Sequence, residues 1–245
     1  MKDNDLIKLN KETYNKIAHL FAETRKYLWD DLKPLQKYTK DGFRVLDLGC
    51  GSGRLYHLFQ DFQPIEKARG KGVEYIGLDQ SEEQIKIAKQ KFPNIDFRVG
   101  EMTTLPFVDN EFDVLYCIAT FHHLPDEESR IKSLQEMKRV LKSGSYILMT
   151  NWNMYSKTAQ KLVENGKFNE FKPGDFLIPW MNSEREVLGE RYYHGFILEE
   201  LENLFKKTGL HVEDQYYTTK GVAGSKTNPG NIVSIIKKAG EAGKA

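Results

Sequence analysis

The stretch that most constrains the fold is residues 45–53, in which an apolar run with one aspartate leads into glycines at every second position. The apolar part predicts a buried strand, and the glycines predict a sharp turn into a helix. Glycine has no Cβ and accepts a positive φ, so the backbone can turn tightly and a ligand can approach its amide groups closely. A loop of this kind is typical of nucleotide-binding proteins.

Strand and helix patterns alternate on both sides of this loop. The expected strands are 43–48, 73–78, 95–99, 112–118, 146–150, 211–217 and 232–237. The expected helices follow residue 52 and cover 82–91, 127–141 and 197–207, with Ser81 placed to cap the second of them. This alternation predicts a doubly wound α/β domain, whose seven-stranded sheet is mostly parallel and ends in a C-terminal antiparallel hairpin. Ligands of such sheets bind at the carboxyl ends of the strands.

The 245 residues are enough for one such domain with an insertion. Residues 1–40 carry apolar positions at helical spacing and are expected to form an N-terminal helical lid, before a ligand-binding core over 41–151. Residues 152–195 break the alternation, and their many aromatic side chains indicate an insertion that packs over the site. Residues 196–238 are expected to hold the last helix and the hairpin, and 239–245 a frayed tail.

Composition argues against several classes of protein. The sequence has no apolar run long enough to span a bilayer and no amino-terminal signal pattern, so we expect a cytoplasmic protein without a membrane partner. Two cysteines, Cys50 and Cys117, are too few for a disulfide framework or a cysteine-rich metal site, and we assign no metal. The formal net charge of +1 argues against a protein wrapped in nucleic acid but is compatible with a local basic face.

The residues around the glycines discriminate between nucleotide ligands. The Walker lysine is absent, and Arg54 stands where the dinucleotide fingerprint would have its third glycine. Asp47 precedes the glycines, where a carboxylate would oppose a pyrophosphate but attract the ammonium group of a methionine moiety. Asp79 ends the second strand and suits the hydroxyls of a ribose, while Glu101 and Met102 follow the third strand and suit an adenine. These positions favour S-adenosylmethionine, although Glu101 also fits an ordinary exposed turn.

Two further candidates lie before the loop, on the expected lid. Tyr14 and Arg25 place an aromatic ring and a cation near the ligand, although Tyr14, like Trp29, equally fits an anchor between helix and core. The residues expected to bind the cofactor are Tyr14, Arg25, Asp47, Gly49, Cys50, Gly51, Gly53, Asp79, Gln80, Glu101, Met102 and Ile118.

These motifs resemble those of the class I S-adenosylmethionine-dependent methyltransferases, over most of residues 40–150. The resemblance rests on residues 45–53, on Asp79, on residues 100–102 and on the later segments 105–107 and 112–113. A glutamate stands at residue 101 where the family usually has an aspartate. The resemblance implies an enzyme with a Rossmann-like fold that transfers a methyl group.

A narrower resemblance extends over almost the whole chain, to the tRNA wobble-uridine carboxymethyl methyltransferases. Residues 14–18 with 24–25, 118–124, 175–180 and 191–194 carry it. It implies that the chain esterifies the carboxylate of 5-carboxymethyluridine in the anticodon loop of tRNA, and that a small zinc-binding activator protein is a possible partner. The sequence departs from the family at residues 231–233, where Asn-Ile-Val replaces an asparagine followed by two tryptophans.

The resemblance also places the acceptor site. Arg191 suits a carboxylate or phosphate through bidentate hydrogen bonds, and the three residues after it suit a uridine pocket. An acceptor carboxylate is already ionised at neutral pH and needs no general base. Of the two histidines after the fourth strand, one is expected to line the acceptor site and the other to cap a turn. The expected catalytic residues are His122, His123, Arg191, Tyr192, Tyr193 and His194.

Other interpretations stay open at this point. A salt-bridged Arg191 among core tyrosines is the structural alternative for the last motif. A methyltransferase acting on a small-molecule carboxylate, hydroxyl or amine agrees with the near-neutral charge and the missing tryptophans. A non-catalytic cofactor-binding subunit would show the same cofactor motifs.

Overall fold

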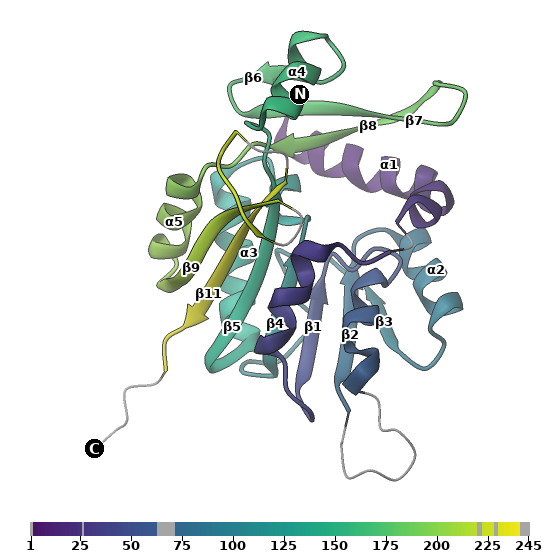
Figure 1. The fold of residues 1–245 in the computed structure, drawn as a ribbon. Helices are drawn as coiled ribbons and strands as arrows, with labels where there is room; N and C mark the ends of the chain where they lie inside the picture. Colours follow the sequence, from purple (N-terminus) through teal and green to yellow (C-terminus); the bar gives the residue numbers. More distant parts are fainter. Residues whose placement is uncertain (1, 26, 63–71, 220–221, 228–229, 241–245) are drawn as a thin grey trace.

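A computed structural model describes residues 2–25, 27–62, 72–219, 222–227 and 230–240 (Figure 1). The strands of its main sheet are β1 (Arg44–Leu48), β2 (Glu74–Asp79), β3 (Asp96–Val99), β4 (Phe112–Ile118), β5 (Leu141–Trp152), β9 (Leu210–Thr219), β10 (Val222–Ala223) and β11 (Asn231–Lys238). They lie in the order β10-β9-β11-β5-β4-β1-β2-β3. Of the expected tail over 239–245, residues 241–245 lie outside the described residues.

The five strands from β3 to β5 are parallel, and β11 runs against them, next to β5. β1 pairs in parallel with β2 and β4, and β11 pairs antiparallel with both β5 and β9. The expected doubly wound sheet with a C-terminal antiparallel hairpin is therefore confirmed. The expected count of seven strands is wrong, because β10 folds back on the end of β9, with Val222 opposite Thr219. Two residues are too few for a period-two pattern to mark this strand in the sequence.

Helices cover both faces of the main sheet. They are α1 (Asp3–Thr24), α2 (Glu82–Lys91), α3 (Glu127–Val140), α4 (Lys157–Glu164) and α5 (Leu198–Lys207), with 3-10 segments η1 (Asp30–Tyr38), η2 (Arg54–Phe62) and η3 (Phe121–His123). Strand alternation sends Leu46 to the face that packs on α3 and α5, and Val45 to the face that packs on η1, η2 and α2. α2 has the expected bounds, since the Ser81 side chain accepts from the Gln84 amide. The helix expected after residue 52 is a 3-10 segment.

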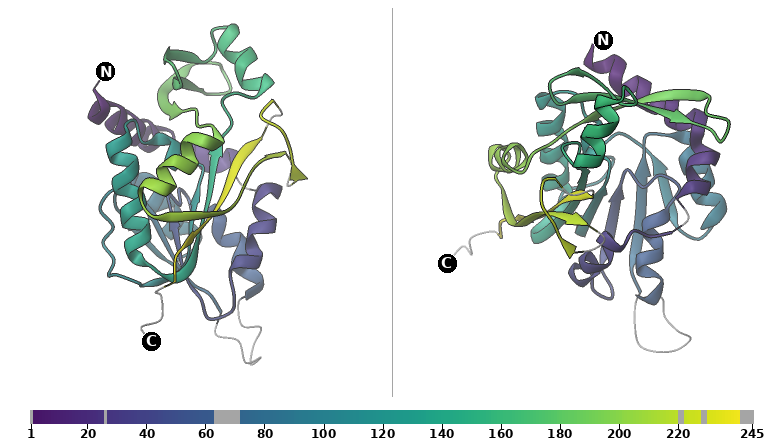
Figure 2. Two further views of the ribbon diagram at one scale, coloured as in Figure 1. Left: turned by 90° about the vertical axis from the view of Figure 1, so that its left-hand side faces the viewer. Right: turned by 45° about the horizontal axis from the view of Figure 1, so that its top comes forward.

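The expected insertion contains regular structure of its own. It holds α4 and a three-stranded antiparallel sheet of β6 (Asn169–Lys172), β7 (Asp175–Met181) and β8 (Val187–His194). This small sheet and α1 lie together across one end of the main sheet, above the carboxyl ends of its parallel strands (Figures 1 and 2). Asn10 of α1 fixes them to each other, because its amide both donates to the Tyr192 carbonyl and accepts from the Tyr192 amide. Together, α1 and the small sheet form a cap over the end of the sheet.

Among the described residues, no helix has the length and apolar character needed to cross a bilayer.

Candidate active site

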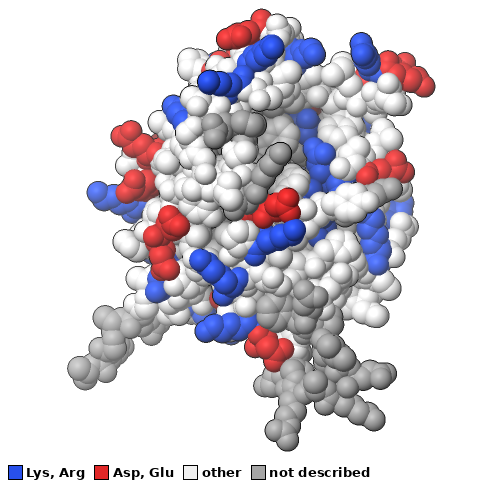
Figure 3. Space-filling model, in the orientation of Figure 1, with Lys and Arg blue, Asp and Glu red and all other residues white. Residues whose placement is uncertain are grey.

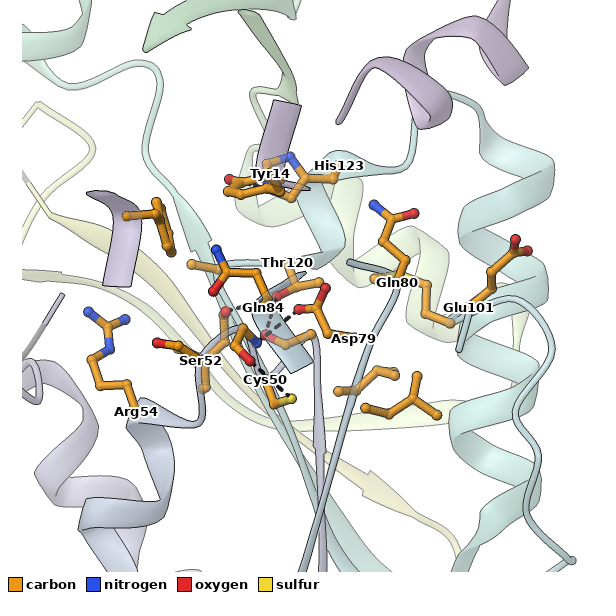
Figure 4. A pocket seen from close by; sticks show the side chains of 18 of the residues that line it. Tyr14, Cys50, Ser52, Arg54, Asp79, Gln80, Gln84, Glu101, Thr120 and His123 are labelled. Atoms are coloured by element: carbon orange, nitrogen blue, oxygen red, sulfur yellow. Dashed lines mark hydrogen bonds between the residues drawn. The ribbon is translucent and has the colours of Figure 1, made fainter. Parts of the chain in front are cut away.

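A cavity lies between the carboxyl ends of the parallel strands and the cap (Figure 4). Its floor comes from the loop after β1, the end of β2, residues 100–103 and residues 118–120, and its roof includes Tyr14, Arg25, Trp152 and Tyr193. Of the expected cofactor residues, the cavity brings together Tyr14, Arg25, Gly49, Cys50, Gly51, Asp79, Gln80, Glu101, Met102 and Ile118. Asp47 and Gly53 are not among its lining residues.

The glycine loop is held tightly at the end of β2. The amides of Gly49 and Cys50 both donate to the Leu78 carbonyl, at 2.7 and 3.1 Å. Gly49 has φ +77°, and a Cβ there would lie 2.2 Å from the Thr120 side chain. The third glycine of the loop, Gly53, packs against Phe97 rather than the cavity, since a Cβ at Gly53 would lie 2.8 Å from that ring. Glycine is therefore required at residue 49 by both conformation and space.

Asp79 sits where β2 meets the loop. One carboxylate oxygen accepts from the Gly51 amide and the other from the Ser81 amide, each at 2.9 Å. Burial raises the pKa of Asp79, while these backbone hydrogen bonds act in the opposite direction. A carboxylate has about four acceptor positions, so each oxygen retains one for a ligand. Two adjacent hydroxyl donors would match this arrangement.

Asp47 lies below the loop in the core. It is 2% exposed, and the Tyr75 hydroxyl donates to its carboxylate. Burial raises the pKa of Asp47 to about 7. The Asp47 carboxylate does not line the cavity, so its contact with the ligand remains a prediction from the sequence.

Polar residues that the sequence analysis did not select also line the cavity. Gln84 is 1% exposed, and neither amide atom of its side chain has a hydrogen-bond partner among the described residues. Its Oε1 lies 3.8 Å from the position of a Cβ on Gly51, and Figure 4 shows it close to Cys50, Ser52 and Asp79. In the sequence, the position of Gln84 in the first turn of α2, directly after the capped end, was the feature that could have indicated its place in the cavity.

Arg54 and Thr120 were missed for different reasons. Arg54 lines the cavity with its guanidinium 4.2 Å above the Trp29 ring, and burial lowers its pKa to about 10. In the sequence, Arg54 indicated only that the loop is not a dinucleotide fingerprint. Thr120 packs on Gly49, a contact between distant segments that spacing along the chain does not show.

A hydrogen-bonded chain crosses the roof from Arg191 to His123. Arg191 Nη1 donates to the Tyr193 hydroxyl at 2.7 Å, Tyr193 and Tyr14 share a hydrogen bond of 3.3 Å, and Tyr14 meets His123 Nε2 at 3.0 Å. His123 Nδ1 lies 2.8 Å from the Tyr192 carbonyl, which only accepts. His123 therefore carries its proton on Nδ1, and Tyr14 donates to Nε2. Burial lowers the pKa of His123 to about 4, which keeps the ring neutral at pH 7.

Aromatic rings surround this chain. The Tyr193 ring packs at a small interplanar angle on both Trp152 and His122, whose centroids each lie 4.9 Å from its own. His123 lines the cavity, whereas His122 is fully buried and accepts from the Trp152 amide at 3.3 Å. Burial lowers the pKa of His122 well below its ordinary value. The two histidines thus have different surroundings, as two adjacent residues usually do.

Arg191 is a buried cation that does not itself line the cavity, but its guanidinium bonds to Tyr193, which does. It is 3% exposed, its guanidinium lies 5.0 Å from the Trp180 centroid, and no carboxylate of the described residues pairs with it. Burial acts to lower the pKa of Arg191, but Tyr193 and Tyr14 outweigh that effect and raise it. Arg25 approaches the same Trp180 ring at 5.9 Å. Figure 3 shows Lys and Arg atoms inside the hollow below the cap, whereas the outer surface in that view carries both signs.

Alternation along β8 separates the last expected motif into two halves. Arg191 and Tyr193 face the hydrogen-bonded chain, while Tyr192 and His194 face the opposite side. There the Tyr192 hydroxyl donates to Asp175 at 2.6 Å, and His194 contacts Asp175 and Glu200 at 2.8 Å each. Tyr192 and His194 do not line the cavity. The described part of the chain contains no group of three or more His, Cys, Asp or Glu side chains arranged to hold a metal ion.

Known proteins with related sequences identify the family of the chain. The methyltransferase domain family matches residues 39–209. The tRNA (carboxymethyluridine(34)-5-O)-methyltransferase of Schizosaccharomyces pombe is 28% identical over 84% of this chain and 90% of its own length. A mouse relative named probable tRNA methyltransferase 9B is 26% identical over 73% of this chain. The matched region covers only 36% of the mouse protein.

Solved structures share the fold. An S-adenosylmethionine-dependent methyltransferase of Methanosarcina mazei has a TM-score of 0.65 at 22% identity, covering 85% of this chain and 98% of its own. A Haloferax volcanii complex of the Trm112 methyltransferase activator with a putative methyltransferase has a TM-score of 0.64 at 19% identity, covering 94% of this chain and 97% of its own. The glycine loop and the acid at the end of β2 lie within the matched 39–209 segment, and the chain belongs to the methyltransferase domain family.

Proposed function

We propose that this chain uses S-adenosylmethionine to esterify the carboxylate of a 5-carboxymethyl group on the wobble uridine of tRNA. The acceptor is inferred from Arg191, a buried guanidinium directly behind the cavity residue Tyr193, with an unpartnered Nε and no carboxylate partner among the described residues. Burying an unpaired charge is costly, so a site of this kind suits an anionic ligand group. The name of the Schizosaccharomyces pombe relative supplies an acceptor of that chemistry.

The cavity fits S-adenosylmethionine. Asp79 would accept from the two ribose hydroxyls, Glu101 and Met102 would hold the adenine, and the unpartnered amide of Gln84 offers one donor and one acceptor to the ligand. The cofactor supplies a methyl group on a positively charged sulfur. Gly49 lets the loop pack directly against Thr120, where any Cβ would overlap the threonine side chain.

The residues of the roof would orient the acceptor rather than remove a proton from it. A carboxylate is ionised at neutral pH, so a general base is not required. His123 uses its Nε2 lone pair to accept from Tyr14, and its pKa of about 4 leaves the ring neutral. Arg191 would bind the carboxylate through paired hydrogen bonds, the Tyr193 and Trp152 rings that line the cavity would contact the uracil, and the cap would exclude water.

Labelled cofactor and tRNA that lacks the wobble modification test this function. The expected product is a methyl ester in the tRNA that alkali releases. Arg191→Gln should lower kcat/KM for tRNA by about 10- to 100-fold, because it removes a charge-assisted contact of roughly 1.5–3 kcal/mol. Arg98→Gln is the matched control, since Arg98 lies on the edge strand β3 and pairs with Asp96. A methyl ester formed equally well by the Arg191 variant would contradict the assignment of the acceptor.

The remaining outcomes distinguish the other functions. Methylation in a metabolite extract without labelling of tRNA would favour a small-molecule acceptor, and cofactor binding without turnover on any acceptor would indicate a non-catalytic subunit. The assay should include an added activator protein, because the structurally similar Haloferax volcanii methyltransferase occurs in a complex with Trm112.

A further inference from the structure

The side of β8 that faces away from the cavity carries a charged cluster that the proposed reaction does not use. It consists of Asp175 on β7, Tyr192 and His194 on β8, Glu200 on α5 and Arg130 on α3, and we call it the His194 cluster. The His194 side chain is 13% exposed and that of Arg130 is 7% exposed. The cluster therefore joins the small sheet to two helices of the core.

The hydrogen bonds of His194 define its protonation. Nδ1 lies 2.8 Å from Asp175 and Nε2 lies 2.8 Å from Glu200. A carboxylate only accepts, so both ring nitrogens donate and the ring is an imidazolium. Burial acts to lower the pKa of His194, but the two carboxylates outweigh it and raise the pKa above its ordinary value. With Arg130, the cluster holds two cations and two carboxylates in balance.

The cluster also fixes the backbone on both sides of the acceptor site. Arg130 Nε donates to the Leu124 carbonyl at 3.1 Å and Nη2 to the Pro125 carbonyl at 3.2 Å, directly after His123. Tyr192 connects the cluster to His123, because its hydroxyl donates to Asp175 and its backbone carbonyl accepts from His123 Nδ1. Arg191 and Tyr193 are the chain neighbours of Tyr192. Any shift of β8 relative to residues 123–125 would therefore move Arg191 and Tyr193 relative to His123.

We propose that His194 is a positioning residue, which with Asp175, Glu200 and Arg130 holds β8 in the register that places Arg191 and Tyr193 against His123. The role of these residues toward an acceptor rests on the function proposed above. His194 itself does not touch the cavity and acts through the strand.

Protonation of His194 gives this arrangement a pH dependence. The facing groups are Asp175, Tyr192, Glu200 and Arg130, with Tyr155 and His122 also nearby. As the pH rises through the raised pKa of His194, one ring nitrogen stops donating, and Arg130 is then the only cation of the cluster. The register of β8 is held below the pKa of His194 and weakened above it. The value of kcat should therefore fall as the pH rises through this pKa.

His194→Gln is the test, with His211→Gln on the exposed surface of β9 as the matched control. The His194 variant should bind S-adenosylhomocysteine as the wild type does, lose about 10- to 100-fold in kcat on tRNA, and lack the alkaline limb of the pH profile. Its ¹⁵N NMR spectrum should show His123 losing its preference for the Nδ1-protonated form. A folded variant with wild-type kcat and an unchanged His123 signal would overturn the proposal.

Two additions keep the test decisive. If His194→Gln does not fold, Glu200→Gln removes one charge and preserves the shape, and it should reduce kcat and disturb His123 in the same way. If the wild type does not methylate tRNA, the proposed function fails, but the NMR comparison still decides whether the cluster positions His123. An unchanged His123 signal in both variants would refute the positioning role.

Discussion

Replacing Gly49 by alanine tests how closely the glycine loop approaches Thr120. The new Cβ would lie 2.2 Å from both Cγ2 and Oγ1 of Thr120, and residue 49 would keep a φ of +77°. The positive φ costs a residue with a Cβ roughly 1–2 kcal/mol. Relieving the overlap requires the loop or Thr120 to move, at a further cost of about 1–3 kcal/mol. We therefore expect the free energy of unfolding to fall by about 2–5 kcal/mol in Gly49→Ala.

The chain offers a matched control for the conformational part of this cost. Gly144 has a φ of +79°, and a Cβ there would meet no atom within 4 Å. Gly144→Ala should therefore lose only about 1–2 kcal/mol in urea unfolding. Calorimetric titration with S-adenosylhomocysteine should show weaker binding for Gly49→Ala and unchanged binding for Gly144→Ala, because only the first residue belongs to the cavity.

A double-mutant cycle isolates the contact with Thr120. Thr120→Gly removes the atoms that the new Cβ would meet, so combining it with Gly49→Ala should recover part of the lost stability. The reasoning is refuted if Gly49→Ala and Gly144→Ala lose the same free energy, or if the cycle shows no coupling between residues 49 and 120.

Three further predictions concern the floor of the cavity. Asp79→Ala should weaken binding of S-adenosylhomocysteine by at least about 10-fold in calorimetry, since each hydrogen bond to a charged group contributes roughly 1.5–3 kcal/mol; unchanged affinity would remove Asp79 from the site. Gln84→Met keeps the side-chain size but lacks the amide, and should weaken the same binding without lowering the free energy of unfolding, because the amide has no partner among the described residues. The folded pKa of Asp47, about 7, lies above its ordinary 3.8, so the folded protein retains a proton that the unfolded chain has lost, and stability falls as the pH rises between these values. Asp47→Asn should remove that fall, gaining up to about 4 kcal/mol relative to wild type between pH 4 and 8 in urea unfolding; a constant difference between the two proteins would contradict the assigned pKa.

The cofactor side of the site was predictable because its signals are local. The glycines, Asp79 and the residues after β3 each follow a strand directly, and parallel strands bring their carboxyl ends to one edge. The bounds of α2 were predictable because Ser81 caps it through a side-chain hydrogen bond. Asp47 also lies near a strand end, but the local spacing could not show that its carboxylate is buried in the core, where it accepts a hydrogen bond from Tyr75.

The acceptor side was harder, because it depends on which residues of the insertion form strands. Residues 152–195 mix polar and aromatic positions and are interrupted at Pro173 and Gly174, so their three-stranded sheet was not evident. All four residues from Arg191 to His194 were expected to reach the substrate. Once they lie on a strand, only alternate residues can face it, which is why Tyr192 and His194 turn to the opposite side.

The cap also has a consequence for the order in which the protein becomes functional. Asn10 and Thr13 of α1 bond to residues that follow them by 182 and 177 positions, and Tyr14 meets Tyr193 across 179 positions. Closing contacts over so much chain is slow compared with forming neighbouring strands and helices. During synthesis, α1 emerges before β8 and has no partner strand until β8 leaves the ribosome. The parallel strands β1 to β5, which carry the glycine loop and Asp79, are therefore expected to associate before the cap closes over them.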